Sequence, residues 1–315
     1  MKNLLLFIVV IAISIGCDKI ENPVIEKGNS IDTDLYPGEG NYFIPEFGEY
    51  PSEEINILIE DFTGHKCGNC PGAATIAHSI QQENPERVIV AAIHSSPPPY
   101  AFQTPNESDD EDYPKYNHDF RTESGNQYPL DIEGFIGNPV GLVNRVTDDS
   151  QQIWQFHPNW NTRVNEILSD NSPLIMNVQV NTNYYTETRG LFIHVLSETL
   201  LDIEGRYTMV VYLIDDERID WQKDYTQNPQ DIEFYHHSHV LLDNINGTYG
   251  DQLFASTSVA GESFENHYTY ALPEDIELDS SNPEEETGLS VIVYLMNRDT
   301  YEIVQVIQKE VLVTF

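Results

Sequence analysis

One stretch decides the fold of the first half of this chain: residues 55–71 read INILIEDFTGHKCGNCP. The apolar, β-branched run at 55–62 predicts a buried strand, and the residues at 63–66 predict a turn. Apolar residues then recur at helical spacing over 71–82, and a proline is tolerated in a first helical turn. A second apolar run at 87–93 predicts another buried strand. This order of strand, helix and strand predicts a right-handed βαβ unit.

Cys67 and Cys70 stand where the first strand passes into the helix. Cysteines at positions i and i+3 of a first helical turn face the same way and can close a disulfide. Free backbone N–H groups and the positive end of the helix dipole stabilise a thiolate there, and His65 and Lys66 add positive charge. The pattern favours a redox pair in which Cys67 attacks and Cys70 resolves. A structural disulfide and half of a metal site are the alternatives.

The N-terminus has the pattern of an export signal. Lys2 precedes an apolar run, Leu4–Ile13, that is short for a membrane span. The run ends in Ser14-Ile-Gly-Cys17, which resembles a bacterial lipobox. We expect residues 1–16 to be a lipoprotein signal peptide, Cys17 to carry the lipid anchor, and residues 17–53 to form a tether. A plain N-terminal anchor helix is the alternative.

This reading places the rest of the chain in the cell envelope, outside the cytoplasm. The chain has three cysteines, and the lipobox takes one of them. An oxidising envelope permits a disulfide between the remaining two, Cys67 and Cys70.

Two domains are expected after the tether. The first spans 54–171, with an insertion at about 95–130 that is marked by three prolines and an acidic run. The second spans 172–315, where strand-like segments alternate apolar and polar residues. These segments predict an all-β, antiparallel sandwich of immunoglobulin-like type, and they are 174–186, 190–200, 206–214, 290–296 and 301–314.

The net charge of −37, from 52 acidic and 15 basic residues, limits the partners of this chain. Such a charge repels phosphate backbones and anionic lipids, so nucleic acid is excluded as a partner. No Gly-rich phosphate loop is present in the sequence, and we expect no cofactor.

The residues around the cysteine pair resemble the active-site strand and helix start of thioredoxins. Asp61 stands where thioredoxins carry a buried acid that moves protons for the resolving thiol. The run at 137–140, Gly-Asn-Pro-Val, resembles the turn that carries their cis-proline, here Pro139. The resemblance implies a thioredoxin-like α/β fold with Cys67, Cys70, Asp61 and Pro139 as site residues. Lys66 departs from the tryptophan usual in thioredoxins, and the 95–130 insertion is longer than any thioredoxin loop.

The chain also resembles the outer-membrane-protein-28-like (Omp-28-related) lipoproteins of Gram-negative bacteria. Residues 60–71 carry this resemblance, and 235–240 and 246–250 extend it into the second domain. It implies an outer membrane lipoprotein with a thioredoxin-like domain followed by a β domain.

Two functions remain open at the level of the sequence. One is a thiol–disulfide oxidoreductase that acts on protein thiols or disulfides. The other is a non-enzymatic lipoprotein whose disulfide is structural and whose β-sandwich binds an envelope protein or a glycan. His237 and His239 share one face of an expected strand and are weak metal candidates, but no further ligand accompanies them.

Overall fold

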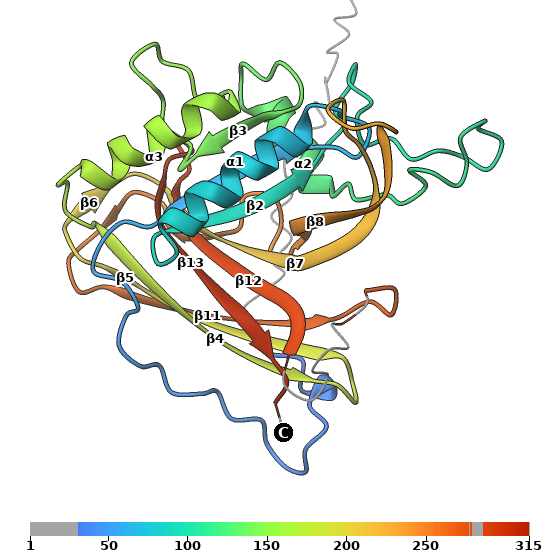
Figure 1. The fold of residues 1–315 in the computed structure, drawn as a ribbon. Coiled ribbons are helices and arrows are strands. Elements are labelled where there is room, and N and C mark those ends of the chain that lie inside the picture. The colour runs from blue at the N-terminus through green and yellow to red at the C-terminus, as the bar shows by residue number, and fades with distance from the viewer. Residues whose placement is uncertain (1–30, 277, 279–285, 315) are drawn as a thin grey trace, which may run out of the picture.

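The computed structural model describes residues 31–276, 278 and 286–314. The expected signal peptide and Cys17 lie outside the described residues. Within them, no helix is long and apolar enough to cross a membrane. The architecture is mostly β-sheet with few helices (Figure 1). In chain order the elements are η1 (Thr33–Leu35), β1 (Ile57–Thr63), α1 (Cys70–Glu83), β2 (Val88–His94), α2 (Glu123–Asp131), β3 (Val140–Val143), η2 (His157–Asn159), α3 (Trp160–Ser169), β4 (Met176–Tyr185), β5 (Gly190–Thr199), β6 (Ile203–Glu204), β7 (Tyr207–Lys223), β8 (Asp231–Asn244), β9 (Asp251–Phe254), β10 (Thr257–Ser258), β11 (Ser263–Ala271), β12 (Glu286–Asn297) and β13 (Ile303–Leu312).

The βαβ unit expected from the sequence forms as β1, α1 and β2. All seven residues of β1 are buried, as the continuous apolar run requires. Strands β1 and β2 pair in parallel, and β3 adds to β1 in antiparallel orientation. Helices α1 and α3 pack on these three strands, with Ala77, Ile80 and Trp160 in their shared core.

A single sheet joins the two halves of the chain. Its strand order is β13-β12-β7-β8-β2-β1-β3, and β9 pairs with β7 as its eighth strand. Strands from both sides of residue 172 therefore hydrogen-bond within one sheet, and the expected domain boundary does not divide it. The junction between the halves is short, since β2 and β8 pair in parallel at Ala92 and Val240.

A second layer covers part of this sheet. Strands β11, β5 and β4 form a three-stranded sheet that packs against β7, β12 and β13 (Figure 1). Val178, Ile193, Val211 and Val293 lie in the core between the two sheets. The opposite side of β7 and β12 faces another core, which contains Phe62, Tyr128 and Trp154.

The second half of the expected tether is packed on the protein. Residues 32–53 lie along β4. Alternate amides of β4 bind its backbone: Asn177 donates to Ser52 O (2.6 Å), Gln179 to Gly48 O (3.2 Å) and Asn181 to Glu46 O (3.2 Å). The ring of Tyr42 stacks on Phe192 of β5 at 4.3 Å. The tether expected over 17–53 is therefore held along its second half, where side chains of β4 bind three of its backbone carbonyls.

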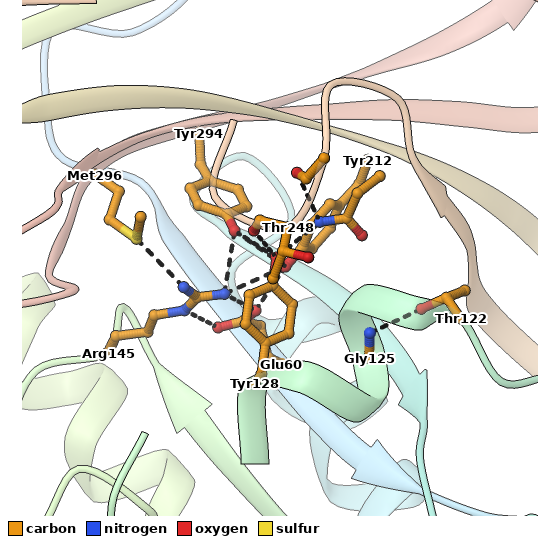
Figure 2. Close-up of polar contacts among 11 residues, drawn as sticks. Glu60, Thr122, Gly125, Tyr128, Arg145, Tyr212, Thr248, Tyr294 and Met296 are labelled. Carbon is orange, nitrogen blue, oxygen red and sulfur yellow. Dashed lines mark hydrogen bonds and ion pairs between the residues drawn. The ribbon is translucent and has the colours of Figure 1, made fainter. Parts of the chain in front are cut away.

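A fully buried ion pair links the strands of both halves (Figure 2). Arg145, just after β3, donates from Nε and Nη2 to the two carboxylate oxygens of Glu60 on β1, at 2.7 and 2.6 Å. The hydroxyl of Tyr212 on β7 donates to the same carboxylate (2.9 Å), and Arg145 Nη2 donates to the hydroxyl of Tyr294 on β12 (3.1 Å). The hydroxyl oxygen of Tyr128 on α2 lies 3.0 Å from that of Tyr212. Every charge in this network has a partner, as buried charges require.

Candidate functional site

Cys67 and Cys70 form a disulfide at the start of α1. Cys70 is the first residue of that helix, and Pro71 occupies its first turn. The two residues are 2% and 1% exposed, so the disulfide is buried. A thiolate must reach a sulfur atom to exchange with a disulfide. In this conformation the protein itself blocks that approach.

The tip of the long β7–β8 hairpin covers the cysteine turn. The side-chain amide of Gln222 donates to Cys67 O at 3.0 Å, and the backbone N–H of Tyr225 donates to Gly68 O at 2.9 Å. The backbone N–H of Lys223 donates to His65 O at 2.8 Å. A Cβ on Gly68 would lie 2.4 Å from the Tyr225 ring, so glycine is required for this close approach. The sequence did not predict this cover.

The 95–130 insertion packs beside the hairpin. Phe102 O accepts a hydrogen bond from the backbone N–H of Lys66 at 2.8 Å. Lys115 and Tyr116 of the insertion both bind Asp231 of β8, at 2.9 and 2.6 Å. The insertion therefore holds the hairpin beside the cysteine turn and supports one side of that turn.

The positive charge expected from His65 is absent at neutral pH. His65 is fully buried, and burial together with the nearby Lys66 lowers its pKa to about 3. Burial also lowers the pKa of Lys66. The sequence shows that basic residues lie next to Cys67, but it does not show that they are buried, and burial lowers the pKa of both side chains.

Asp61 and Cys70 line one cavity of about 240 Å³ between α1, β2 and β8. Asp61 is 2% exposed, and burial raises its pKa to about 7. Its Oδ1 atom has no hydrogen-bond partner among the described residues. The structure thus brings together the acid and the second cysteine that the sequence proposed as partners.

Pro139 lies in a second cavity, a groove of about 700 Å³ that also includes Gly68 and Asn69 of the cysteine turn. The Asn138–Pro139 peptide bond is cis. The side-chain amide of Asn138 donates to Thr63 O at 2.6 Å and to Ser95 O at 3.2 Å, which fixes the turn against the ends of β1 and β2. Neither cysteine lines this groove in the described part of the chain.

His237 and His239 of β8 line the cavity that contains Asp61, together with His94 of β2. His94 and His237 are 2% and 5% exposed, and burial lowers their pKa values, that of His237 to about 4. Within the described ranges, no group of three or more ligating side chains is arranged to hold a metal ion. The weak metal candidates therefore share a cavity without a complete ligand set.

Comparison with known proteins locates the chain in a family. The family model described as outer membrane protein Omp28 matches residues 126–314, which begins after the cysteine pair and includes Pro139 and His237. No curated protein matches the chain.

Solved structures show a likeness over most of the chain. HBP35 of Porphyromonas gingivalis superposes with a TM-score of 0.55 at 18% identity, covering 82% of this chain and 76% of that one. A protein of Agrobacterium tumefaciens gives 0.46 at 12% identity, over 82% and 95% of the two chains. A domain of the outer membrane lipoprotein Omp28 from Porphyromonas gingivalis gives 0.28 at 17% identity, over 45% and 92%. The likeness to HBP35 shows a shared fold.

Proposed function

Because this chain belongs to the Omp28 family of outer membrane proteins, we propose that it is a non-enzymatic envelope lipoprotein with a structural Cys67–Cys70 disulfide. In this proposal Cys17 carries the lipid anchor and a thioredoxin-like unit serves as a scaffold. The burial of the disulfide beneath the β7–β8 hairpin carries the proposal, because a catalytic pair needs one reachable sulfur.

Several features support the architecture in this proposal. The order β1-α1-β2 with a CxxC at the helix start, followed by a cis-proline before β3, is the arrangement that the thioredoxin resemblance implies. The two packed sheets of the second half support an immunoglobulin-like sandwich. The net charge of −37 favours an envelope partner with a basic surface.

A second candidate function is thiol–disulfide exchange. It is favoured by Asp61, whose pKa of about 7 suits proton transfer at neutral pH and which lines one cavity with Cys70. In this alternative the hairpin must open before the disulfide can react.

The reactivity of the disulfide separates the two candidates. We expect dithiothreitol to reduce the native disulfide far more slowly than the same disulfide in the urea-unfolded chain, as measured by alkylation and mass spectrometry. We also expect no catalysis of insulin reduction. Insulin reduction that is faster than with dithiothreitol alone, and that is lost in Cys67→Ser, contradicts the structural proposal and supports the exchange.

Opening of the hairpin should control this reactivity. Gln222→Ala removes the amide that donates to Cys67 O, and we expect it to speed reduction by about tenfold, which corresponds to about 1.4 kcal/mol for the lost hydrogen bonds. Gln227→Ala is the matched control, because Gln227 is exposed on the same hairpin. Equal rates for both variants would show that the hairpin does not guard the disulfide.

Removing the disulfide should weaken the fold without abolishing it. In Cys67→Ala/Cys70→Ala the closed loop is short, and the loop-entropy relation gives a loss of about 2 kcal/mol in the free energy of unfolding. Urea denaturation monitored by tryptophan fluorescence measures it, and the wild-type protein under dithiothreitol serves as the comparison. An unchanged midpoint of urea denaturation in the double variant would show that the disulfide does not stabilise the fold.

A further inference from the structure

A histidine-rich cavity lies beside α1, on the surface formed by β1, β2 and β8. Its volume is about 240 Å³. Five of the chain's ten histidines line it, on three different elements: α1, β2 and β8. These histidines are His78, His94, His236, His237 and His239.

Residues that line this cavity also hold buried polar atoms without a partner among the described residues. They are Oδ1 of Asp61, both ring nitrogens of His94, Nε2 of His237 and Nδ1 of His239. Asp61, His94 and His237 are each at least nine-tenths buried. An unpaired buried polar group costs about 1–3 kcal/mol, so these side chains favour an occupant toward which they can turn to gain a hydrogen bond.

The charges of the residues that line the cavity disfavour two classes of ligand, anions and bare metal ions. No lysine or arginine is among the described residues that line the cavity, whereas Asp61 is. An anion would therefore lack a counter-charge, and the net charge of −37 would oppose its entry. A bare metal ion would lack a ligand set, since the described residues offer no group of three suitable side chains.

Part of the remaining wall is apolar. Ala74 and Ala77 of α1 and Val90 and Ala92 of β2 line it, and Tyr235 of β8 adds an aromatic ring. An occupant with an apolar part and a hydrogen-bond-donating, positively charged end matches both halves of the lining.

We propose that this cavity is a binding site for a small organic amine, whose ammonium group contacts Asp61 and the buried imidazoles. The ammonium pairs with the carboxylate of Asp61, which lines the cavity beside the imidazoles of His94 and His237. The carbon chain lies against Ala74, Ala77 and Val90. Cys70 also lines this cavity, and the site extends beyond the proposed function.

Three probes of one shape test the proposal: 3-methylbutylamine, 3-methylbutanol and 3-methylbutanoate. In ¹H–¹⁵N NMR titrations of the full mature chain, we expect the amine to shift the signals of Ala74, Ala77 and Val90 with a Kd in the millimolar range, as suits so small a ligand. The alcohol should bind about tenfold more weakly, and the carboxylate should leave these signals unchanged. Binding of the carboxylate as tight as that of the amine, or no shift with any probe, would overturn the proposal.

Variants locate the charge that the amine requires. Asp61→Asn should weaken binding of the amine at least about tenfold and leave binding of the alcohol unchanged, because the loss of one ion pair at a buried site costs at least about 1.4 kcal/mol. Glu233→Gln is the matched control: it also removes one negative charge from the chain, but Glu233 is exposed on β8 and does not line the cavity. An equal loss of amine affinity in both variants would indicate that the overall negative charge of the protein attracts the amine. This result would overturn the proposed site.

The pH profile provides a second readout. Asp61 has a pKa of about 7 because of its burial, so affinity for the amine should rise from pH 6 to pH 8 as the carboxyl ionises. This rise should disappear in Asp61→Asn. A rise that persists in this variant would assign the titration to another facing group and contradict the role of Asp61. The other titratable groups that face Asp61 or line the cavity are His78 on α1, His94 on β2, and Tyr235, His236, His237 and His239 on β8.

Discussion

Replacement of Arg145 by methionine is expected to lower the free energy of unfolding by about 3–5 kcal/mol. Arg145 and Glu60 are fully buried, and the guanidinium donates two hydrogen bonds to the carboxylate. Methionine fills a similar volume but leaves the Glu60 carboxylate with the Tyr212 hydroxyl as its remaining donor among the described residues. The loss arises mainly from an uncompensated buried charge rather than from the attraction of the pair itself.

Urea denaturation at neutral pH measures this loss. Arg206→Met is the matched control, because Arg206 pairs with Asp299 on the surface, where both side chains are about half exposed. The control should cost less than about 1 kcal/mol. Glu60→Gln combined with Arg145→Met should cost less than the sum of the single variants, because the double variant leaves no charge behind. An Arg145→Met loss as small as that of Arg206→Met would show that the buried pair is not required.

Much of this fold follows from local sequence. Strand β2 is an apolar run up to His94, β1 is largely apolar, and α1 has apolar residues at helical spacing, so the pattern of apolar residues predicts all three. The sequence also predicts a helix over 158–169, and α3 begins two residues later than this because η2 precedes it. The predicted strands at 174–186 and 190–200 correspond to β4 and β5.

The elements that the sequence did not predict are those whose burial depends on distant partners. Strand β8 contains charged and histidine residues, with no alternation that marks a core. It is a strand because it pairs along β7 and touches β2 at Val240. The cavity and the cover of the disulfide both depend on this strand, so neither could be derived from the residues around Cys67.

A signal for the buried ion pair was nevertheless present in the sequence. Glu60 and Asp61 interrupt the apolar strand, and a carboxyl in a buried strand is either paired with a cation, as Glu60 is, or favoured in its neutral form, as Asp61 is. The identity of the partner of Glu60 was not predictable, since Arg145 lies 85 residues away and follows β3 in a left-handed conformation (φ 53°). The sequence pattern thus indicates that both carboxyls are buried, but not that Glu60 is paired with Arg145 and that Asp61 has no such partner.

Asp61→Asn is expected to stabilise the protein at neutral pH by about 2–4 kcal/mol. Burial raises the pKa of Asp61 from 3.8 in the unfolded chain to about 7 in the folded one. Between these values the folded state holds a proton that the unfolded state has lost. The stability contributed by the neutral carboxyl is therefore complete below pH 3.8 and declines as pH rises towards 7, by about 1.4 kcal/mol per pH unit. Asparagine resembles the protonated acid and cannot ionise, so the variant lacks this decline.

The comparison requires unfolding free energies of both proteins at several pH values between 4 and 8. The two should be similar near pH 4, and the variant should gain steadily to pH 7 and then remain constant. Groups that titrate in both proteins, such as His237, contribute equally and cancel in the difference. Asp109→Asn, on the exposed insertion, is the control and should give a difference independent of pH. A constant difference for Asp61→Asn as well would mean that water reaches this carboxyl, and that the cavity beside Cys70 is wetter than its apolar wall implies.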